Sequence, residues 1–202
     1  MRKLVKLVWA AALVLSMFLM GTVLADRHTL NTQLIRLRVV GASDGETDQQ
    51  IKLEVRDAVN EYLQNHMPKE LDASEAEVFL EAHIADITQV ADEKLRELGD
   101  SNSVRVRLSK EETDVRNYDT FSLPSGVYKT LRVDIGKAQG SNWWCVVFPS
   151  LCVQPTVEAF QDSAVAGGLS TGLGNTLAGE DGYQVRFFFL DCLGKLEKIF
   201  HK

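Results

Sequence analysis

The chain has 202 residues and a formal net charge of −6, so it lacks the basic surface that general nucleic-acid binding requires. Its length is enough for a leader segment and one domain with a sizeable core. Its four histidines are scattered and no Cys-x-x-Cys motif occurs, which argues against a zinc site. We expect no metal, no cofactor, no nucleic-acid partner and no small-molecule substrate.

The N-terminus has the pattern of a secretory signal peptide over residues 1–25. It begins with three basic residues, Arg2, Lys3 and Lys6. An apolar run from Leu7 to Met20 follows, and Val23-Leu24-Ala25 has the small residues of a cleavage site. The alternative is an uncleaved anchor, because the apolar segment is nearly long enough to span a bilayer. We favour cleavage, since helix-breaking Gly21 precedes the site, and we expect residues 26–202 to form a single extracytoplasmic domain.

The first half of this domain has the pattern of one strand and two helices. Aliphatic residues alternate with arginines over residues 35–39, which predicts a half-buried strand. Two overlapping capping boxes within residues 43–50 predict the start of a helix, and Pro68 predicts its end. A capping box at residues 74–77 begins a second, longer helix that ends before Gly99. We expect the two helices to form an antiparallel pair laid on one face of a sheet.

The second half is predicted to be rich in strands. Four strands and a short terminal helix are indicated at residues 104–108, 131–135, 143–148, 183–190 and 193–199, respectively. Six of the fourteen glycines lie between residues 167 and 182, so we expect a flexible insertion at about 163–182. The predicted fold class is α+β, with a mostly antiparallel sheet, the two-helix pair packed on one face and a short C-terminal helix.

Residues 140–152 hold two of the three tryptophans. Trp143 and Trp144 are neighbours in a predicted strand, so their side chains point to opposite faces and cannot enter the same core. Either both faces of the strand are covered or one ring faces outward, where aromatic side chains often anchor partners.

The same stretch holds two of the three cysteines. Cys145 and Cys152 lie seven positions apart, and a strand that turns back at Pro149 can bring their sulfur atoms within bonding distance. Exported chains meet an oxidising environment. We therefore predict a disulfide between these two residues, which leaves Cys192 free.

Arginine and large aromatic residues are predicted to share one face of the sheet. If the aliphatic positions face the helices, the opposite face receives Arg36, Arg38, Arg105, Arg107, Arg132, Arg186, Phe188 and one tryptophan. This is the composition of an interaction hot spot. The candidate partner-binding residues are Trp143, Trp144, Asn142, Arg36, Arg38 and Arg132. The alternative is a solvated face with internal ion pairs to Asp134 and Glu111, partly covered by the terminal helix.

The sequence offers no convincing catalytic arrangement. Acidic residues within 44–48 begin like a calcium loop, but Gln49 and Val55 stand where that loop needs glycine and glutamate, so helix capping explains them better. His83 and Asp86 lie three positions apart on a predicted helix, a spacing that more often gives a surface hydrogen bond than a catalytic dyad. The cysteines have no histidine nearby in sequence to activate a thiolate. We therefore expect no enzyme.

Five segments carry a family resemblance. They are IRLRVVGASDGETDQQ at 35–50, KLEVRDAV at 52–59, PSGVY at 124–128, LRVDIG at 131–136 and GSNWWCVVFPSLC at 140–152. Together they look like the two signatures of the stage II sporulation protein R family, and the tryptophan-cysteine run is the most specific of them. Three residues depart from the family pattern: Gly45 stands in place of serine, Ser150 in place of a second proline and Val153 in place of phenylalanine. These changes affect turn shape and one apolar contact after Pro149 and leave both signatures recognisable.

The resemblance implies a developmental signal and not a catalyst. Members of this family are made in the forespore of endospore-forming bacteria and secreted into the extracytoplasmic space between the forespore and mother-cell membranes. There they activate a membrane-embedded aspartic protease of the mother cell, which processes the sigma factor E precursor. The alternatives are an extracytoplasmic binding module without a link to sporulation, or a thiol-dependent cell-envelope enzyme that uses Cys145 or Cys152.

Overall fold

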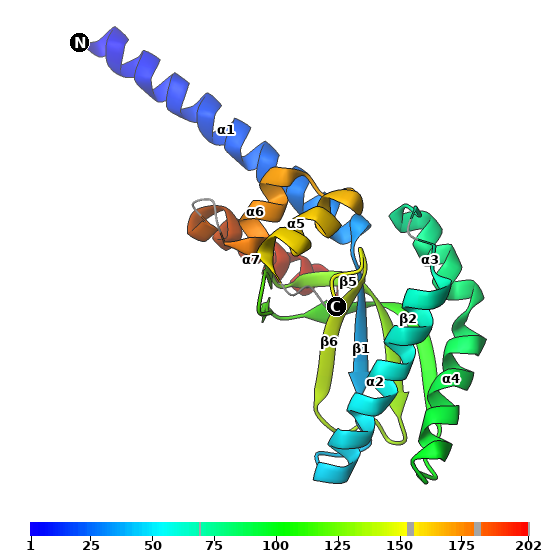
Figure 1. The fold of residues 1–202 in the computed structure, drawn as a ribbon. Helices are drawn as coiled ribbons and strands as arrows, with labels where there is room; N and C mark the ends of the chain where they lie inside the picture. The colour runs from blue at the N-terminus through cyan, green and yellow to red at the C-terminus, as the bar shows by residue number, and fades with distance from the viewer. Residues whose placement is uncertain (69, 153–155, 180–182, 202) are drawn as a thin grey trace.

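The structure is a computed structural model, and it describes residues 1–202 apart from 69, 153–155, 180–182 and 202 (Figure 1). Its helices and strands are α1 (Arg2–Gln33), β1 (Ile35–Val40), α2 (Glu46–His66), α3 (Ala73–Ala82), α4 (Ile84–Glu97), β2 (Val104–Thr113), β3 (Arg116–Asn117), β4 (Ser122–Leu123), β5 (Gly126–Ile135), β6 (Asn142–Phe148), α5 (Val157–Ala166), α6 (Thr171–Ala178) and α7 (Tyr183–His201). The expected mixture of helices and strands is confirmed.

The main sheet has the strand order β2-β5-β1-β6 and is mixed. β2 is antiparallel to β5 and β6 is antiparallel to β1, but the two central strands β1 and β5 are parallel, with Leu37 opposite Leu131. The prediction of a mostly antiparallel sheet is therefore wrong. In Figure 1 the chain runs down β1, up α2, down α4, up β2 and down β5, and this alternation makes the central strands parallel.

α2 and α4 cover one face of the sheet, and the main core lies between these two layers. β1 contributes the alternating residues Ile35, Leu37 and Val39, which are fully buried. Each helix contributes a stripe of buried residues, Val55, Val59 and Leu63 from α2 and Ile87, Ala91 and Leu95 from α4. The two-residue period of the strand and the 3.6-residue period of the helices therefore meet in one apolar layer.

The second predicted helix is interrupted. α3 and α4 are separate, because His83 between them leaves the helical conformation with φ −104° and ψ 11°. No proline or glycine marks this break in the sequence. The N-cap of α3 is Asp72, whose side chain forms a capping box with Glu75, two residues before the predicted box of Ser74 with Glu77. Gly99 follows the end of α4 with φ +72°, as its predicted role in ending the helix requires.

The C-terminal part is helical where the sequence predicted a strand and a flexible insertion. Residues 183–190 belong to α7, and the predicted short terminal helix is the later part of the same helix. Within the predicted insertion, the Ser170 hydroxyl accepts the Leu173 N–H at the start of α6, which buries Leu173 and Leu177. Residues 180–182 of that segment lie outside the described residues. A second core is enclosed by α5, α6, α7, the end of α1 and the β3–β4 hairpin. The apolar surface buried there offsets the entropy cost of ordering this glycine-rich segment.

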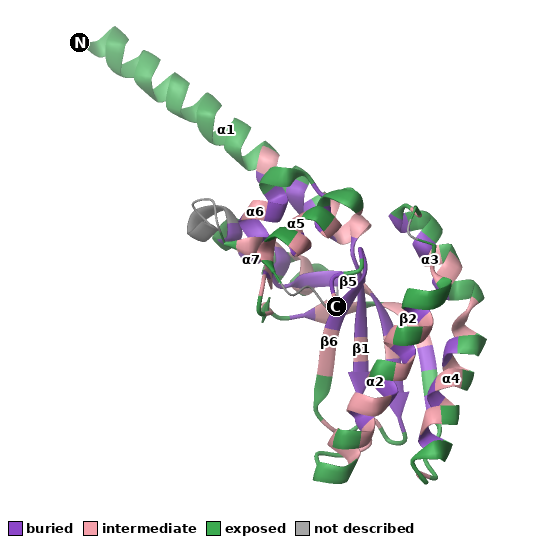
Figure 2. Ribbon diagram, viewed as in Figure 1, coloured by how far each residue is buried: buried purple, intermediate pink, exposed green. Residues whose placement is uncertain are grey.

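α1 continues past the predicted cleavage site as one helix. Figure 2 shows that its N-terminal part is exposed, and it is the one described helix that is long and apolar enough to cross a membrane. This segment is compatible with a signal sequence. The last turns of α1 are buried at Val23, Arg27 and Leu30. Arg27 donates to the Tyr128 hydroxyl at 3.0 Å and pairs with Glu197, which attaches the end of α1 to β5 and α7.

Candidate functional site

The face of the sheet opposite α2 and α4 carries the predicted arginine surface, because strand side chains alternate between faces. We define the arginine face as Arg36, Arg38, Arg105, Arg107, Glu111, Arg132, Asp134 and Trp144. Near the start of β1 it is covered by the second core, which includes Tyr128 and Val146. Exposure increases towards the other end of the strands, from fully buried Arg36 to half-buried Arg38 and exposed Arg105.

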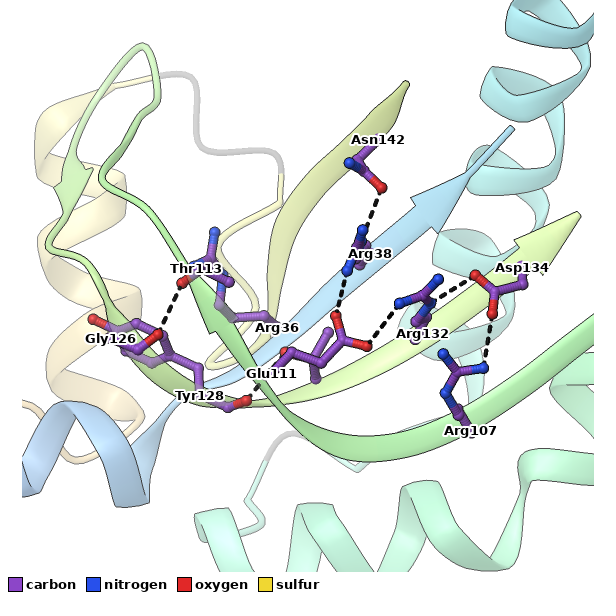
Figure 3. A network of polar contacts seen from close by, with 11 residues as sticks. Arg36, Arg38, Arg107, Glu111, Thr113, Gly126, Tyr128, Arg132, Asp134 and Asn142 are labelled. Carbon is purple, nitrogen blue, oxygen red and sulfur yellow. Dashed lines mark hydrogen bonds and ion pairs between the residues drawn. The ribbon is translucent and has the colours of Figure 1, made fainter. Parts of the chain in front are cut away.

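Two carboxylates join three arginines of this face in one ion-pair network (Figure 3). Glu111 accepts from Arg38 Nη1 at 2.8 Å and from Arg132 Nη1 at 3.3 Å. Asp134 accepts from Arg132 Nε at 2.6 Å and from Arg107 Nη1 at 2.7 Å. Burial alone lowers the pKa of Arg132, but the hydrogen bonds and charges of Asp134 and Glu111 outweigh it and raise that pKa. The internal ion pairs to Asp134 and Glu111 that the sequence left open are therefore present.

Trp144 lies at the centre of a group of arginines. The guanidinium carbons of Arg36, Arg38 and Arg116 lie 4.7, 4.9 and 5.5 Å from its ring centroid. These distances are within the range of cation–π attraction. The indole Nε1 is buried and has no hydrogen-bond partner among the residues that the structure describes. Trp144 therefore serves as an aromatic platform that holds three cations close together.

Arg36 is the buried anchor of this group. It is fully buried, and it donates to Thr113 Oγ1 at 2.6 Å and to the Tyr118 hydroxyl at 3.1 Å. Its guanidinium also lies 5.3 Å from the Tyr128 ring centroid, and burial raises the pKa of that tyrosine. Within the described chain it has no ion pair with a carboxylate, and its Nε has no hydrogen-bond partner. Neutral oxygens and two aromatic rings thus surround a charge that is costly to bury.

The structure brings together five of the six candidate partner-binding residues. Asn142 accepts from Arg38 Nε at 2.8 Å and so extends the ion-pair network to the start of β6. Trp143 lies on the opposite face, where it packs against the main core with Arg56 Cζ 4.9 Å above its ring. The two tryptophan rings diverge, as the alternation of a strand predicts. Of the other predicted surface residues, Phe188 is exposed on α7, and the side chain of Arg186 lies outside the described residues.

Sequence reasoning missed the contribution of the β3–β4 hairpin. Arg116 stacks over Trp144 from this hairpin, and Tyr118 holds Arg36. The Tyr118 ring stacks on Phe121, which itself stacks on Phe160 of α5. Each hairpin strand has two residues, too few for an alternating pattern to reveal it. The one available signal was the grouping of Arg116, Tyr118 and Phe121 within six residues.

The predicted disulfide between Cys145 and Cys152 is present, with an S–S distance of 2.05 Å. The turn between them is closed by the Leu151 N–H, which donates to the Val146 carbonyl at 3.1 Å. Cys192 is a free, partly buried thiol of α7. Among the described residues, no group of three or more histidine, cysteine or acidic side chains is placed to hold a metal ion.

Comparisons with known proteins agree on one family. The model of the family described as stage II sporulation protein R matches residues 31–158. Stage II sporulation protein R of Bacillus subtilis (strain 168) is 33% identical over 120 residues, which cover 59% of this chain and 54% of that relative. The chain thus spans about half the length of the curated relative that it matches. No solved structure matches.

Proposed function

The chain belongs to the stage II sporulation protein R family, and from this membership we propose that it is a secreted intercellular sporulation signal. It is made in the forespore and exported into the space between the forespore and mother-cell membranes. There it activates a membrane-embedded aspartic protease, which processes the sigma factor E precursor in the mother cell. The family match carries this proposal, because residues 31–158 include every strand of the main sheet.

Export in this proposal depends on the apolar first part of α1. Three basic residues precede it and a small-residue cleavage site lies within the helix. Cleavage after Ala25 would leave the last turns of α1 in place, because Arg27 is held by Tyr128 and Glu197. If the leader is removed, the domain therefore loses Val23 from its second core but keeps Leu30 and Leu34.

Activation in this proposal requires binding and not catalysis. A ligand shifts the protease towards its active conformation or assembly only if it binds that state more tightly than the inactive one. The family is a signalling family, and the arginine face offers a surface of arginine and tryptophan suited to such selective binding. The thiol-enzyme alternative loses its nucleophiles in this structure, because Cys145 and Cys152 are bonded to each other.

Reconstitution in a non-sporulating bacterial host tests the proposal. The full chain is co-expressed with the candidate protease and the sigma factor E precursor, and precursor cleavage is followed on immunoblots. We expect cleavage when the chain carries its leader, and none when residues 2–22 are deleted so that the chain stays in the cytoplasm. Cleavage that is equal with and without the chain would exclude the activator function.

Two further measurements separate a signal from a general envelope-binding module. A reporter placed behind the promoter of this gene should be active in the forespore alone, whereas the gene of a general module would be expressed in growing cells.

Trp143→Ala and Trp144→Ala, compared in the same reconstitution, should affect different quantities. Trp143→Ala should lower the amount of protein because it removes packing from the main core, whereas Trp144→Ala should lower cleavage per molecule of protein.

A further inference from the structure

The arginine face has more cations than its own carboxylates can neutralise. Five arginines and two carboxylates project from it, and the β3–β4 hairpin adds Arg116 above Trp144. Glu111 and Asp134 are already shared among Arg38, Arg107 and Arg132 (Figure 3). Within the described chain, neither Arg105 nor Arg116 forms an ion pair with a carboxylate. The whole chain has a net charge of −6, so this positive excess is local and not a property of the composition.

The cations at both edges of this face are accessible. On β2, Arg105 is exposed and the side chain of Arg107 is 40% exposed. At the β6 edge, exposed Arg116 lies with Arg36 and Arg38 within 5.5 Å of the Trp144 ring centroid, where the three guanidinium groups repel one another. Glu111 pairs with Arg38, but the partners of Arg36 are the neutral oxygens of Thr113 and Tyr118, so the repulsion is offset only in part. A carboxylate placed beside Trp144 would relieve it further and would gain bidentate hydrogen bonds from arginine.

We propose that the arginine face binds an acidic peptide segment of the partner protein that crosses its strands, from Arg105 and Arg107 on β2 at one edge of the sheet to Arg116 and Trp144 at the β6 edge. This inference rests on the proposed function, because it names the chemistry of the partner's contact: aspartate or glutamate side chains in an extracytoplasmic segment. Trp144 supplies the apolar anchor, and the arginines select negative charge. Arginine and tryptophan are the residues most often found at the centre of such contacts.

A protein segment fits this site better than an anionic membrane. The apolar part of α1 leaves the domain beside the second core, at the end of the sheet where β1 begins (Figure 1). Arg105 and Arg107 lie at the other end of the strands, because they pair with Asp134 and Arg132 near the end of β1. A membrane that holds α1 would therefore adjoin the second core and leave Arg105 and Arg107 towards the aqueous space.

Peptide binding to the full chain in a neutral detergent tests the inference. The probes are fluorescent hexaglutamate and hexaglutamine peptides, and fluorescence anisotropy gives their dissociation constants at low and at physiological salt. We expect the wild-type chain to bind hexaglutamate at least about tenfold more tightly than hexaglutamine, a difference of about 1.4 kcal/mol. Arg107→Gln and Arg116→Gln should each weaken hexaglutamate binding several-fold, and added salt should weaken it further.

The chain offers a matched control on the other face of the same strand. Arg56 stacks over Trp143 at 4.9 Å, as Arg116 does over Trp144 at 5.5 Å. Arg56→Gln should therefore leave hexaglutamate binding unchanged. Circular dichroism and thermal unfolding confirm that each variant is folded before binding is compared. Equal binding of the two peptides, or equal loss in Arg56→Gln, would overturn the inference.

Two further experiments distinguish failure of the acidic-segment inference from failure of the proposed function. In the processing reconstitution, a wild-type chain that triggers no cleavage overturns the proposed function whatever the peptide result. A wild-type chain that triggers cleavage, together with a fully active Arg107→Gln/Arg116→Gln double variant, overturns the acidic-segment inference alone. Arginine-dependent binding to phosphatidylglycerol vesicles, without preference for hexaglutamate, would assign the face to a lipid surface and also overturn it.

Discussion

The two faces of the sheet are made by the same strands but are stabilised in different ways. On the helix side, aliphatic residues of β1, β2 and β5 meet the apolar stripes of α2 and α4, and the contact excludes water. On the arginine face, the intervening residues form ion pairs around Glu111 and Asp134 and stack on Trp144. The apolar face is already covered by the helices. The arginine face still has guanidinium N–H groups that can donate hydrogen bonds to another molecule. The first face therefore stabilises the fold, and the second is available for recognition.

Strand β1 shows this difference between two neighbouring residues. Leu37 is fully buried in the main core, and Arg38, the next residue, is half-buried in the ion-pair network. A stability measurement on each residue therefore compares the two faces at one point of the chain. The largest effect is expected on the helix side.

Leu37→Ala should lower the free energy of unfolding by about 2–5 kcal/mol, because it removes buried methyl groups and leaves a cavity in a layer packed from both sides. Urea denaturation of the purified chain in neutral detergent measures this change. Arg38→Ala is the matched variant, and it should cost less because its ion pair with Glu111 is partly solvated. A larger loss for Arg38→Ala than for Leu37→Ala would show that the ion-pair network, and not the apolar layer, dominates stability.

The disulfide should give the next largest effect. In the chain-entropy model, the small loop between Cys145 and Cys152 contributes about 2–3 kcal/mol to the free energy of unfolding. The Cys145→Ala/Cys152→Ala double variant should lose that amount. Reduction of the wild-type chain with dithiothreitol should shift its urea midpoint in the same direction and leave the double variant unaffected. If reduction also shifted the urea midpoint of the double variant, the change would come from Cys192 and not from the disulfide.

These comparisons also mark what the sequence could predict. The main core was predictable because the local pattern and the tertiary contact agree: alternating residues at 35–39 and stripes in α2 and α4 each specify their own buried side. The direction of strand pairing was not predictable in this way. It depends on which strands become neighbours, and β5 pairs with β1 although three helices and the strands β2, β3 and β4 lie between them in the chain.

The C-terminal helices were missed because distant contacts decide them. Residues 183–190 alternate well enough to indicate a strand, but α7 packs against α1 through Glu197 with Arg27 and against the β4–β5 turn through Asp191 with Ser125. At the candidate site, alternation placed the arginines of β1, β2 and β5 on one face, but it left open which tryptophan joins them. Arg116 and Tyr118 could not, because the hairpin that carries them packs through Phe121 on Phe160 of α5.

The contact of α7 with the β4–β5 turn predicts a dependence on pH. Asp191 accepts the Ser125 N–H at 3.0 Å and pairs with Lys195 at 2.8 Å. Burial raises the pKa of Asp191, but the hydrogen bonds from Lys195 and Ser125 outweigh it and hold that pKa below its usual value. A carboxylate with a lowered pKa stabilises the fold above the pKa of the unfolded chain, about 4, and this contribution is lost as the pH falls through the folded value.

Asp191→Asn should therefore lower stability at neutral pH by about 1.5–2 kcal/mol, at the lower end of the range for hydrogen bonds to a charged group. The wild-type chain should lose its advantage over this variant as the pH falls from about 5 towards 2. Urea denaturation at several pH values measures both quantities. Asp119→Asn, at an exposed position of the β3–β4 hairpin, is the control and should follow the wild-type curve. Parallel curves for the wild type and Asp191→Asn would show that the lowered pKa belongs to another carboxylate.

The smallest effect is expected at the centre of the arginine face. Trp144→Phe keeps an aromatic ring for the three guanidinium groups, and the indole N–H that it removes is buried without a hydrogen-bond partner. Loss of an unsatisfied donor offsets part of the lost packing, so the free energy of unfolding should change by less than about 1 kcal/mol. Trp143→Phe on the helix side is the matched change, and Trp144→Ala shows the cost of losing the ring altogether. A loss above about 2 kcal/mol in Trp144→Phe would mean that the indole N–H has a partner in the folded protein. A small loss of stability together with weaker hexaglutamate binding would instead show that the larger indole surface holds the arginines in the arrangement that recognises acidic side chains.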